Sequence, residues 1–307
     1  MILAICPNPC TDVTIELDFL NVGRMNRIRN KQVTYAGKAL NVAVSVERLG
    51  GDSKLTGFMF EENGRQFVSC CNKEKVKNEF VWCEGSARMN YKIIDNKSMM
   101  TEINDKGERV SREKQVELIS LARRLSDGCS IAVMSGSLPQ NVESGYYAEL
   151  CNAIPSTVKK VVDAEGEALL SAVKTGVYMI KPNIEEMERT VGKRLESTAE
   201  MLDACKYMID LGAENVLLSL GRKGAILTNG RESYFCKSAS VAVNSTVGAG
   251  DSMVAAACIQ IEKGKPLDEV LKCAVAGGTA SVTTPGTGLV YMDKYNEILE
   301  RLVVEEL

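Results

Sequence analysis

The sequence contains no histidine among its 307 residues. Histidine is the usual base in Ser-His-Asp and Cys-His catalysis and the commonest ligand of zinc, so its absence excludes those catalytic arrangements and weakens the case for zinc. Any base or activator of a nucleophile must therefore be Asp, Glu, Lys, Tyr or Cys.

Other absences narrow the class of protein. The eleven cysteines include no pair of CxxC units such as a zinc ribbon requires, and we interpret them as free buried thiols. No apolar stretch reaches the roughly 18 residues needed to span a bilayer. The first residues also lack a basic leader and a cleavage site. Because thiols stay reduced in the cytoplasm, we expect a cytoplasmic protein that does not enter a membrane.

The sequence also lacks a large excess of charge of either sign. The chain has 37 Lys and Arg against 40 Asp and Glu, a formal net charge of −3, with no long run of like charge. This balance argues against nucleic acid as the main partner. With 45% apolar residues, the composition suits one large folded domain, or one with a small appendage.

Helical and strand patterns alternate through most of the chain. After a strand at 2–6 and a helix at 38–49, helices are predicted at 112–125, 145–152, 167–173 and 198–211, each before a strand, at 130–134, 160–163, 178–181 and 215–219. A hairpin at 225–236 and helices from about 251, at 266–281 and at 294–304 follow. The later strands are apolar throughout, which is typical of a parallel sheet covered on both faces.

Two early segments instead alternate polar and apolar residues, as half-exposed strands do. Residues 11–35 are expected to hold strands at 12–20 and 27–35, and residues 86–110 two strands joined by a turn at 104–107. We assign both segments to a small second sheet, a lid over the carboxyl ends of the main strands, where open α/β sheets bind ligands. Residues 1–10, 36–85 and 111–307 then form the core.

The strongest local signal for chemistry is the loop STVGAGDS at 245–252, which leads directly into an apolar helix. Its glycines let backbone N–H groups converge on an anion at the positive end of the helix dipole. Asp251 could be a simple cap, or a base that deprotonates a hydroxyl beside those amides. No P-loop string occurs, and Met253 stands where a dinucleotide fingerprint needs its third glycine.

Six motifs in order match a known family: NP at 8–9 with Asp12, GKALNVA at 37–43, SGSLP at 135–139, KPNIEE at 181–186, SLGRKGA at 219–225 and TVGAGDS at 246–252. They resemble the motifs of the ribokinase-like (PfkB) carbohydrate kinases over nearly the whole chain. NPCTD, RMN at 88–90 and TEIN at 101–104 look most like the branch of 1-phosphofructokinase and tagatose-6-phosphate kinase. The resemblance implies a three-layer α/β/α fold with a mostly parallel central sheet and a small β-sheet lid.

The resemblance also implies roles for individual residues. Asp251 would be the base and Gly248, Ala249 and Gly250 the anion hole; Asp12, Arg27, Gly37, Lys38, Asn41, Arg88 and Ser137 would bind the sugar phosphate; Lys181, Asn183, Ser219, Gly221, Gly224 and Thr246 the nucleotide; and Asn183 and Glu186 the Mg²⁺ with its waters. The adenine would lie between residues 221–225 and 274–279. Read alone, Asn183 could equally cap a helix, Ser137 could be a turn residue, and Arg27 could be solvated surface.

The activity implied is ATP-dependent phosphorylation of a ketohexose phosphate, with fructose 1-phosphate giving fructose 1,6-bisphosphate as the first choice. Tagatose 6-phosphate and fructose 6-phosphate are alternative acceptors within the family. A catalytically silent sugar-phosphate sensor is an alternative of another class, although Asp251 and both its glycines are present. Because the lid strands would expose an edge, we expect a homodimer through the lid sheet.

Overall fold

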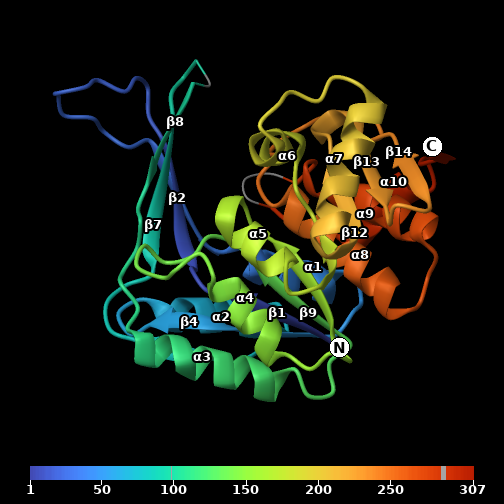
Figure 1. The fold of residues 1–307 in the computed structure, drawn as a ribbon. Coiled ribbons are helices and arrows are strands. Elements are labelled where there is room, and N and C mark those ends of the chain that lie inside the picture. Colours follow the sequence, from blue (N-terminus) through green and yellow to red (C-terminus); the bar gives the residue numbers. More distant parts are fainter. Residues whose placement is uncertain (98, 285–287) are drawn as a thin grey trace.

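Apolar strands far apart in the sequence meet in one sheet at the centre of the molecule (Figure 1). The computed structural model describes residues 1–97, 99–284 and 288–307. In spatial order the sheet contains β15 (Val304–Glu306), β14 (Ser233–Cys236), β13 (Ala225–Thr228), β12 (Ala213–Ser219), β11 (Val177–Ile180), β10 (Lys159–Asp163), β9 (Ile131–Ser135), β1 (Ile2–Cys6), β4 (Ser53–Phe60) and β5 (Lys77–Asn78), with β6 (Val81–Cys83) also on β4. Pairing is parallel from β5 to β12 and antiparallel from β12 to β15.

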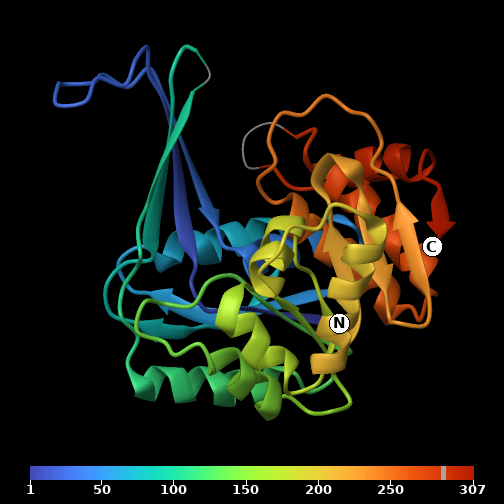
Figure 2. The same cartoon turned by 45° about the horizontal axis from the view of Figure 1, so that its top comes forward.

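Helices cover both faces of this sheet (Figure 2). The helices α2 (Gly64–Lys73), α3 (Arg112–Leu125), α4 (Tyr146–Ala153), α5 (Gly166–Val173), α6 (Ile184–Val191) and α7 (Thr198–Leu211) supply one apolar cluster, and α8 (Ala249–Glu262), α9 (Leu267–Ser281) and α10 (Met292–Leu299) the other, while α1 (Lys38–Arg48) contributes to both. Successive residues of β9 point to opposite clusters, Ile131 and Val133 to one and Ala132 and Met134 to the other. Every residue of the central strands β1 and β9 is therefore buried, and the predicted α/β class is confirmed.

A separate sheet of four strands, in the order β3 (Asn30–Ala36), β2 (Cys10–Glu16), β7 (Arg88–Ile94) and β8 (Met100–Asn104), stands out from the core (Figure 1). It is called the lid here. The β2 and β7 strands run parallel, and the two outer pairs are antiparallel. Because side chains alternate along a strand, Asp12 and Asn90 lie on one face, and Val13 and Tyr91 on the other.

Four predicted elements, a turn, a helix and two strands, have wrong bounds. The turn predicted at 104–107 does not join the lid strands: β7 ends at Ile94 and β8 begins at Met100, so the connection between them precedes β8, which contains Asn104 as its last residue. The predicted helix at 294–304 ends at Leu299, and Val304 then pairs with β14 as an added edge strand. Residues 17–29 form a loop between β2 and β3, where the Asn26 side chain accepts from the Asn21 amide at 2.8 Å. Both strands are therefore shorter at the lid tip than predicted.

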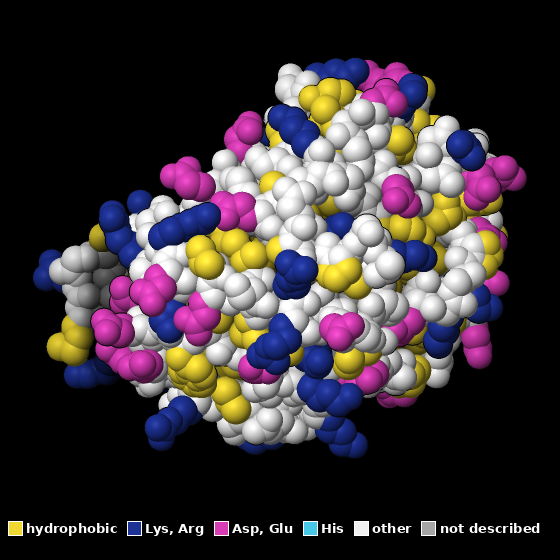
Figure 3. All heavy atoms as spheres, turned by 60° about the horizontal axis from the view of Figure 1, so that its bottom comes forward, with side chains coloured by type: hydrophobic (Ala, Val, Ile, Leu, Met, Phe, Trp, Pro, Cys, Tyr) yellow, Lys and Arg dark blue, Asp and Glu magenta, His cyan; other side chains and the backbone are white. Residues whose placement is uncertain are grey.

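The surface drawn in Figure 3 mixes charges of both signs, with Lys and Arg interspersed among Asp and Glu. This mixture matches the small net charge of the sequence. In the part of the chain that the structure describes, no helix combines the length and the apolar character that crossing a membrane requires.

Candidate functional site

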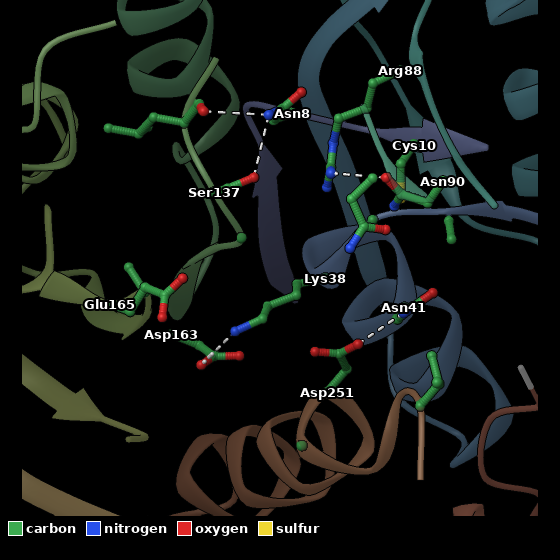
Figure 4. A pocket seen from close by; sticks show the side chains of 18 of the residues that line it. Asn8, Cys10, Lys38, Asn41, Arg88, Asn90, Ser137, Asp163, Glu165 and Asp251 are labelled. Atoms are coloured by element: carbon green, nitrogen blue, oxygen red, sulfur yellow. Dashed lines mark hydrogen bonds and ion pairs between the residues drawn. The ribbon is translucent and has the colours of Figure 1, made fainter. Parts of the chain in front are cut away.

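A cleft of about 910 Å³ lies between the lid and the carboxyl ends of the main strands. Its lining includes many of the residues proposed from the sequence: Asp12, Gly37, Lys38, Asn41, Arg88, Ser137, Lys181, Asn183, Glu186, Ser219, Gly248, Gly250 and Asp251. Figure 4 shows several of these side chains converging from the lid, from α1 and from α8. Motifs up to 239 residues apart in the sequence, from Asp12 to Asp251, thus share one cavity.

The start of α8 places Asp251 in this cleft. Gly248, which precedes the helix, has φ +80°, and a Cβ on it would lie 2.6 Å from the Leu289 side chain. Glycine is therefore needed for this turn. The Asp251 carboxylate does not cap its helix; its Oδ2 accepts from Nδ2 of Asn41 on α1 at 2.8 Å (Figure 4). The simple capping role is thus not the one observed.

The environment of Asp251 makes it a stronger base than an ordinary aspartate. Its pKa is raised from 3.8 to about 6, mainly by burial and next by the negative charge of Asp163. The hydrogen bond from Asn41 and the cations Lys38 and Lys181 oppose this shift of the pKa. The group is therefore ionised at neutral pH and still accepts a proton readily, the combination that general base catalysis requires.

Asp163, at the end of β10, holds two cations of the cleft together. Its carboxylate lies 3.3 Å from Nζ of Lys181 and 3.4 Å from Nζ of Lys38, and accepts from the Ser135 hydroxyl at 3.1 Å. Burial favours a raised pKa, but Lys181 and Lys38 outweigh it and hold the pKa of Asp163 below its ordinary value. The same carboxylate raises the pKa of Lys38. The sequence analysis gave Asp163 no role, although an acidic residue at the end of a buried strand is a signal for one.

Asn183 and Glu186 form the N-terminal capping box of α6. Oδ1 of the Asn183 side chain accepts from the Glu186 backbone amide, and Oε2 of Glu186 accepts from the Asn183 backbone amide, both at 2.8 Å. Both residues also line the cleft. The cap role left open by the sequence is therefore present, and it fixes both side chains at the cavity wall.

The same two side chains fit a magnesium ion, because they offer the hard oxygen ligands that it prefers. The capping box uses Oε2 of Glu186 and does not use Oε1. Among the described residues, no cluster of three or more acidic or cysteine side chains could enclose a metal. A cation here would share its coordination with water and substrate phosphates, as Mg²⁺ does beside nucleotides.

The inner face of the lid carries a row of polar side chains. Nδ2 of Asn90 donates to Oδ1 of Asp12 at 3.1 Å, and Nζ of Lys92 lies 3.1 Å from Oδ2. Arg88 donates to the Asn90 side chain at 3.2 Å. The sequence analysis missed Lys92 and gave Asn90 no role, although the spacing of two residues from Arg88 to Asn90 and from Asn90 to Lys92 predicts one shared face of a strand.

A second cavity of about 520 Å³ adjoins the cleft, and Ser219 and Gly250 line both. It is mostly apolar, with Val241, Met253 and Val282 in its walls. Thr246, Ala249, Gly221 and Thr279 also line it, so it lies between residues 221–225 and the later half of α9.

Two residues proposed from the sequence lie outside both cavities. Arg27 is exposed in the loop between β2 and β3 and lines a separate hollow with Asp18 and Phe19. Gly224 has φ +113°, and a Cβ there would meet the Cys236 carbonyl oxygen at 2.0 Å. This close approach accounts for glycine at 224 without a ligand.

The fold and the cleft together define an open α/β protein whose polar, partly cationic site is covered by a β-sheet lid and adjoins an apolar pocket. Residues 7–294 match the model of the pfkB family carbohydrate kinases. The chain belongs to this family, so the predicted resemblance is confirmed, and the fold is the ribokinase-like one.

The similarity to relatives and to solved structures extends over nearly the full length of the chain. A 1-phosphofructokinase of Borreliella burgdorferi is 31% identical over 92% of this chain and 91% of its own. A tagatose-6-phosphate kinase of Staphylococcus epidermidis is 30% identical over 100% of both chains. The structure of phosphofructokinase-2 from Escherichia coli with potassium has a TM-score of 0.91 at 25% identity and covers 98% of both chains.

Proposed function

We propose that this protein transfers a phosphoryl group from ATP to fructose 1-phosphate, giving fructose 1,6-bisphosphate and ADP. The observation that carries the proposal is a buried carboxylate, Asp251, with a pKa of about 6 at a helix N-terminus beside Lys38 and Lys181. A base, donors for phosphate oxygens and an adjoining apolar pocket are what a sugar kinase needs, because phosphoryl transfer depends mainly on positioning and charge stabilisation.

In this reaction the free 6-hydroxyl of the sugar loses its proton to Asp251 as its oxygen attacks the γ-phosphorus. The new O–P bond forms, and the bond from the γ-phosphorus to the bridging oxygen breaks to release ADP. The backbone amides of Gly248 and Gly250, which line the cleft at the positive end of α8, would bind the oxygens of the transferring group, whereas the Ala249 amide donates to the Thr246 carbonyl at 3.4 Å. Lys38 and Lys181, fixed by Asp163, stabilise the charge on the phosphate oxygens.

The nucleotide is assigned to the two adjoining cavities. Its base would occupy the apolar cavity beside Val241, Met253 and Thr279, and its phosphates would pass Ser219 and Gly250 into the cleft. Asn183 and Glu186 would hold Mg²⁺, directly or through water, and the ion when bound neutralises phosphate charge.

We place the enzyme in the cytoplasm, because all eleven cysteines are free thiols.

A second acceptor, tagatose 6-phosphate, is favoured by the similarity to the tagatose-6-phosphate kinase of Staphylococcus epidermidis, one of the relatives that cover all of this chain. The expected result with intact protein and MgATP is rapid ADP release with one of three sugar phosphates, namely fructose 1-phosphate, tagatose 6-phosphate and fructose 6-phosphate. The preferred sugar should exceed the others at least about tenfold in kcat/KM, because misplacing the attacked hydroxyl costs rate steeply. Failure of all three would favour the silent sensor over the kinase.

We further propose that two chains associate through the outer face of the lid. Val33, Val13, Tyr91 and Ile103 stand in register across the four strands on this face. Val33 is 41% exposed and Ile103 56% exposed in the single chain. An apolar stripe on a thin sheet is typical of a surface that a partner covers.

Ile103→Asp is expected to shift the protein from twice the monomer mass to the monomer mass in light scattering, because a charge would be buried in the interface. The matched control is Val116→Asp on α3, an exposed valine outside the lid, which should leave the mass unchanged. A monomeric parent protein at the working concentration would contradict the proposed dimer.

A further inference from the structure

The lid contains one ion pair that the kinase chemistry outlined above does not use. Nζ of Lys92, on β7, lies 3.1 Å from Oδ2 of Asp12 on β2, and their side chains are only 12% and 7% exposed. Both residues also line the cleft. Because exposed ion pairs contribute little and buried ones are costly to break, a pair at this position has consequences for the site.

The pair holds Asp12 in one orientation. Oδ1 of Asp12 accepts from Asn90 at 3.1 Å and from the Cys10 thiol at 3.5 Å, while Oδ2 faces Lys92. Burial, aided by the charge of Asp12, raises the pKa of Cys10, so its thiol keeps the proton that it donates. Both carboxylate oxygens are therefore held, and Lys92 supplies the only cation among the three donors.

The pair also sets the charge of the lid face. Among the described cleft-lining residues on the lid strands, the charged ones are Asp12, Glu102, Arg88 and Lys92, and Glu102 stands opposite Lys92 in the pairing of β7 with β8. These charges balance. Without Lys92, two carboxylates would face an incoming sugar phosphate against one arginine, and like charges repel strongly in a partly dehydrated cleft.

We propose that Lys92 is a positioning and specificity residue, which orients Asp12 toward the sugar hydroxyls and neutralises it, so that the lid accepts a sugar carrying a phosphate. This inference rests on the proposed function and adds a residue to its acceptor site. Asp12 can then accept hydrogen bonds from the sugar hydroxyls without repelling the phosphate on the same substrate. Lys92 acts through Asp12 and not on the reacting atoms.

The test is steady-state kinetics at saturating MgATP with the sugar phosphate that the parent protein prefers. Lys92→Met should raise KM for the sugar phosphate about 10- to 100-fold, as expected when one partner of a buried charge pair is removed, with kcat within about threefold. Lys92→Arg should keep KM within about fivefold of the parent, because it keeps the charge. KM for MgATP should not change, which also shows that the variants are folded.

A double-mutant cycle distinguishes action through Asp12 from a local packing defect. In an Asp12→Asn background, Lys92→Met should change KM by less than about threefold, because the carboxylate that Lys92 neutralises is gone. Lys77→Met, which removes an exposed lysine paired with Asp52 at 2.7 Å, is the matched control and should leave the kinetics unchanged.

Three results would overturn the role of Lys92. The first is an unchanged KM for the sugar phosphate in Lys92→Met, and the second is a rise of this KM in Lys92→Arg as large as in Lys92→Met. The third is a KM in the double variant that has risen by the product of the rises in Asp12→Asn and Lys92→Met. Each can occur with an active parent enzyme, in which case the proposed kinase function stands and only the role of Lys92 is lost. A parent protein that transfers phosphate to none of the sugar phosphates would instead remove the proposed function itself.

Discussion

Asp251→Asn is expected to lower kcat at least about 100-fold with the preferred sugar phosphate, because it removes the group that accepts the hydroxyl proton. Asparagine has nearly the same shape and retains an oxygen that can accept from Nδ2 of Asn41. KM values for both substrates should therefore change little. The matched control is Asp268→Asn, which alters another acid in the first turn of a helix, α9, and should retain full activity.

The pH dependence of the parent enzyme should report the same group. Only ionised Asp251 can accept the proton, so activity should fall as the pH drops through about 6, the raised pKa of this carboxyl. An ordinary aspartate would place that loss near its usual value of 3.8. Full activity of the parent enzyme at pH 4.5 would contradict the raised pKa, and full activity of Asp251→Asn would exclude Asp251 as the base.

The same substitution should stabilise the fold. Because the pKa of Asp251 is higher in the folded protein, ionisation is harder there, and the free energy of unfolding falls as pH rises from 3.8 through about 6. Above that range the cost is about 3 kcal/mol by the usual conversion of pKa into energy. Denaturant unfolding of Asp251→Asn should therefore show higher stability than the parent at pH 8 and little difference at pH 4. A less stable variant at pH 8 would contradict the raised pKa.

Local patterns predicted most of the core and failed where tertiary pairing decides the structure. Helices such as α3 and α7 bury one face, so their spacing is visible in the sequence, and a central strand such as β1 is apolar throughout. The short strand β15 has no such signal, because Val304–Glu306 becomes a strand only by pairing with β14. The loop at 17–29 depends on side-chain bonds such as that between Asn26 and Asn21.

The residues of the candidate site also fall into those that the sequence predicts and those that it does not. The loop around Asp251 was visible because glycines and an acid stand together in sequence before an apolar helix. Asp163 and Lys92 were not, because their partners are remote: Lys38 is 125 residues from Asp163, and Asp12 is 80 residues from Lys92. No periodicity links residues so far apart, so their charge pairing becomes visible only when strands and helices are assembled.

Asp163→Asn is expected to be the most damaging substitution for stability in the cleft. It leaves Lys181, whose side chain is 5% exposed, without its carboxylate partner, and breaking a buried pair in this way costs about 3 to 5 kcal/mol. Lys38 is 40% exposed and can be solvated, so most of the cost comes from Lys181. The measurement is the free energy of unfolding in denaturant, with kcat/KM determined on the same samples.

The double variant Asp163→Asn with Lys181→Met separates stability from function. Removing both charges should recover much of the lost stability, because no buried charge is then left unpaired, whereas activity should stay low without the lysine. The stabilising effect of Asp163 requires its ionised form, whose pKa is lowered in the folded state, so it is present at neutral pH and lost as acid protonates the carboxyl. Parent and Asp163→Asn should therefore converge in stability at low pH. Asp163 also raises the pKa of Asp251. The activity that remains in Asp163→Asn should therefore be lost at a lower pH than the activity of the parent enzyme. If both enzymes lose activity at the same pH, Asp163 does not raise the pKa of the base.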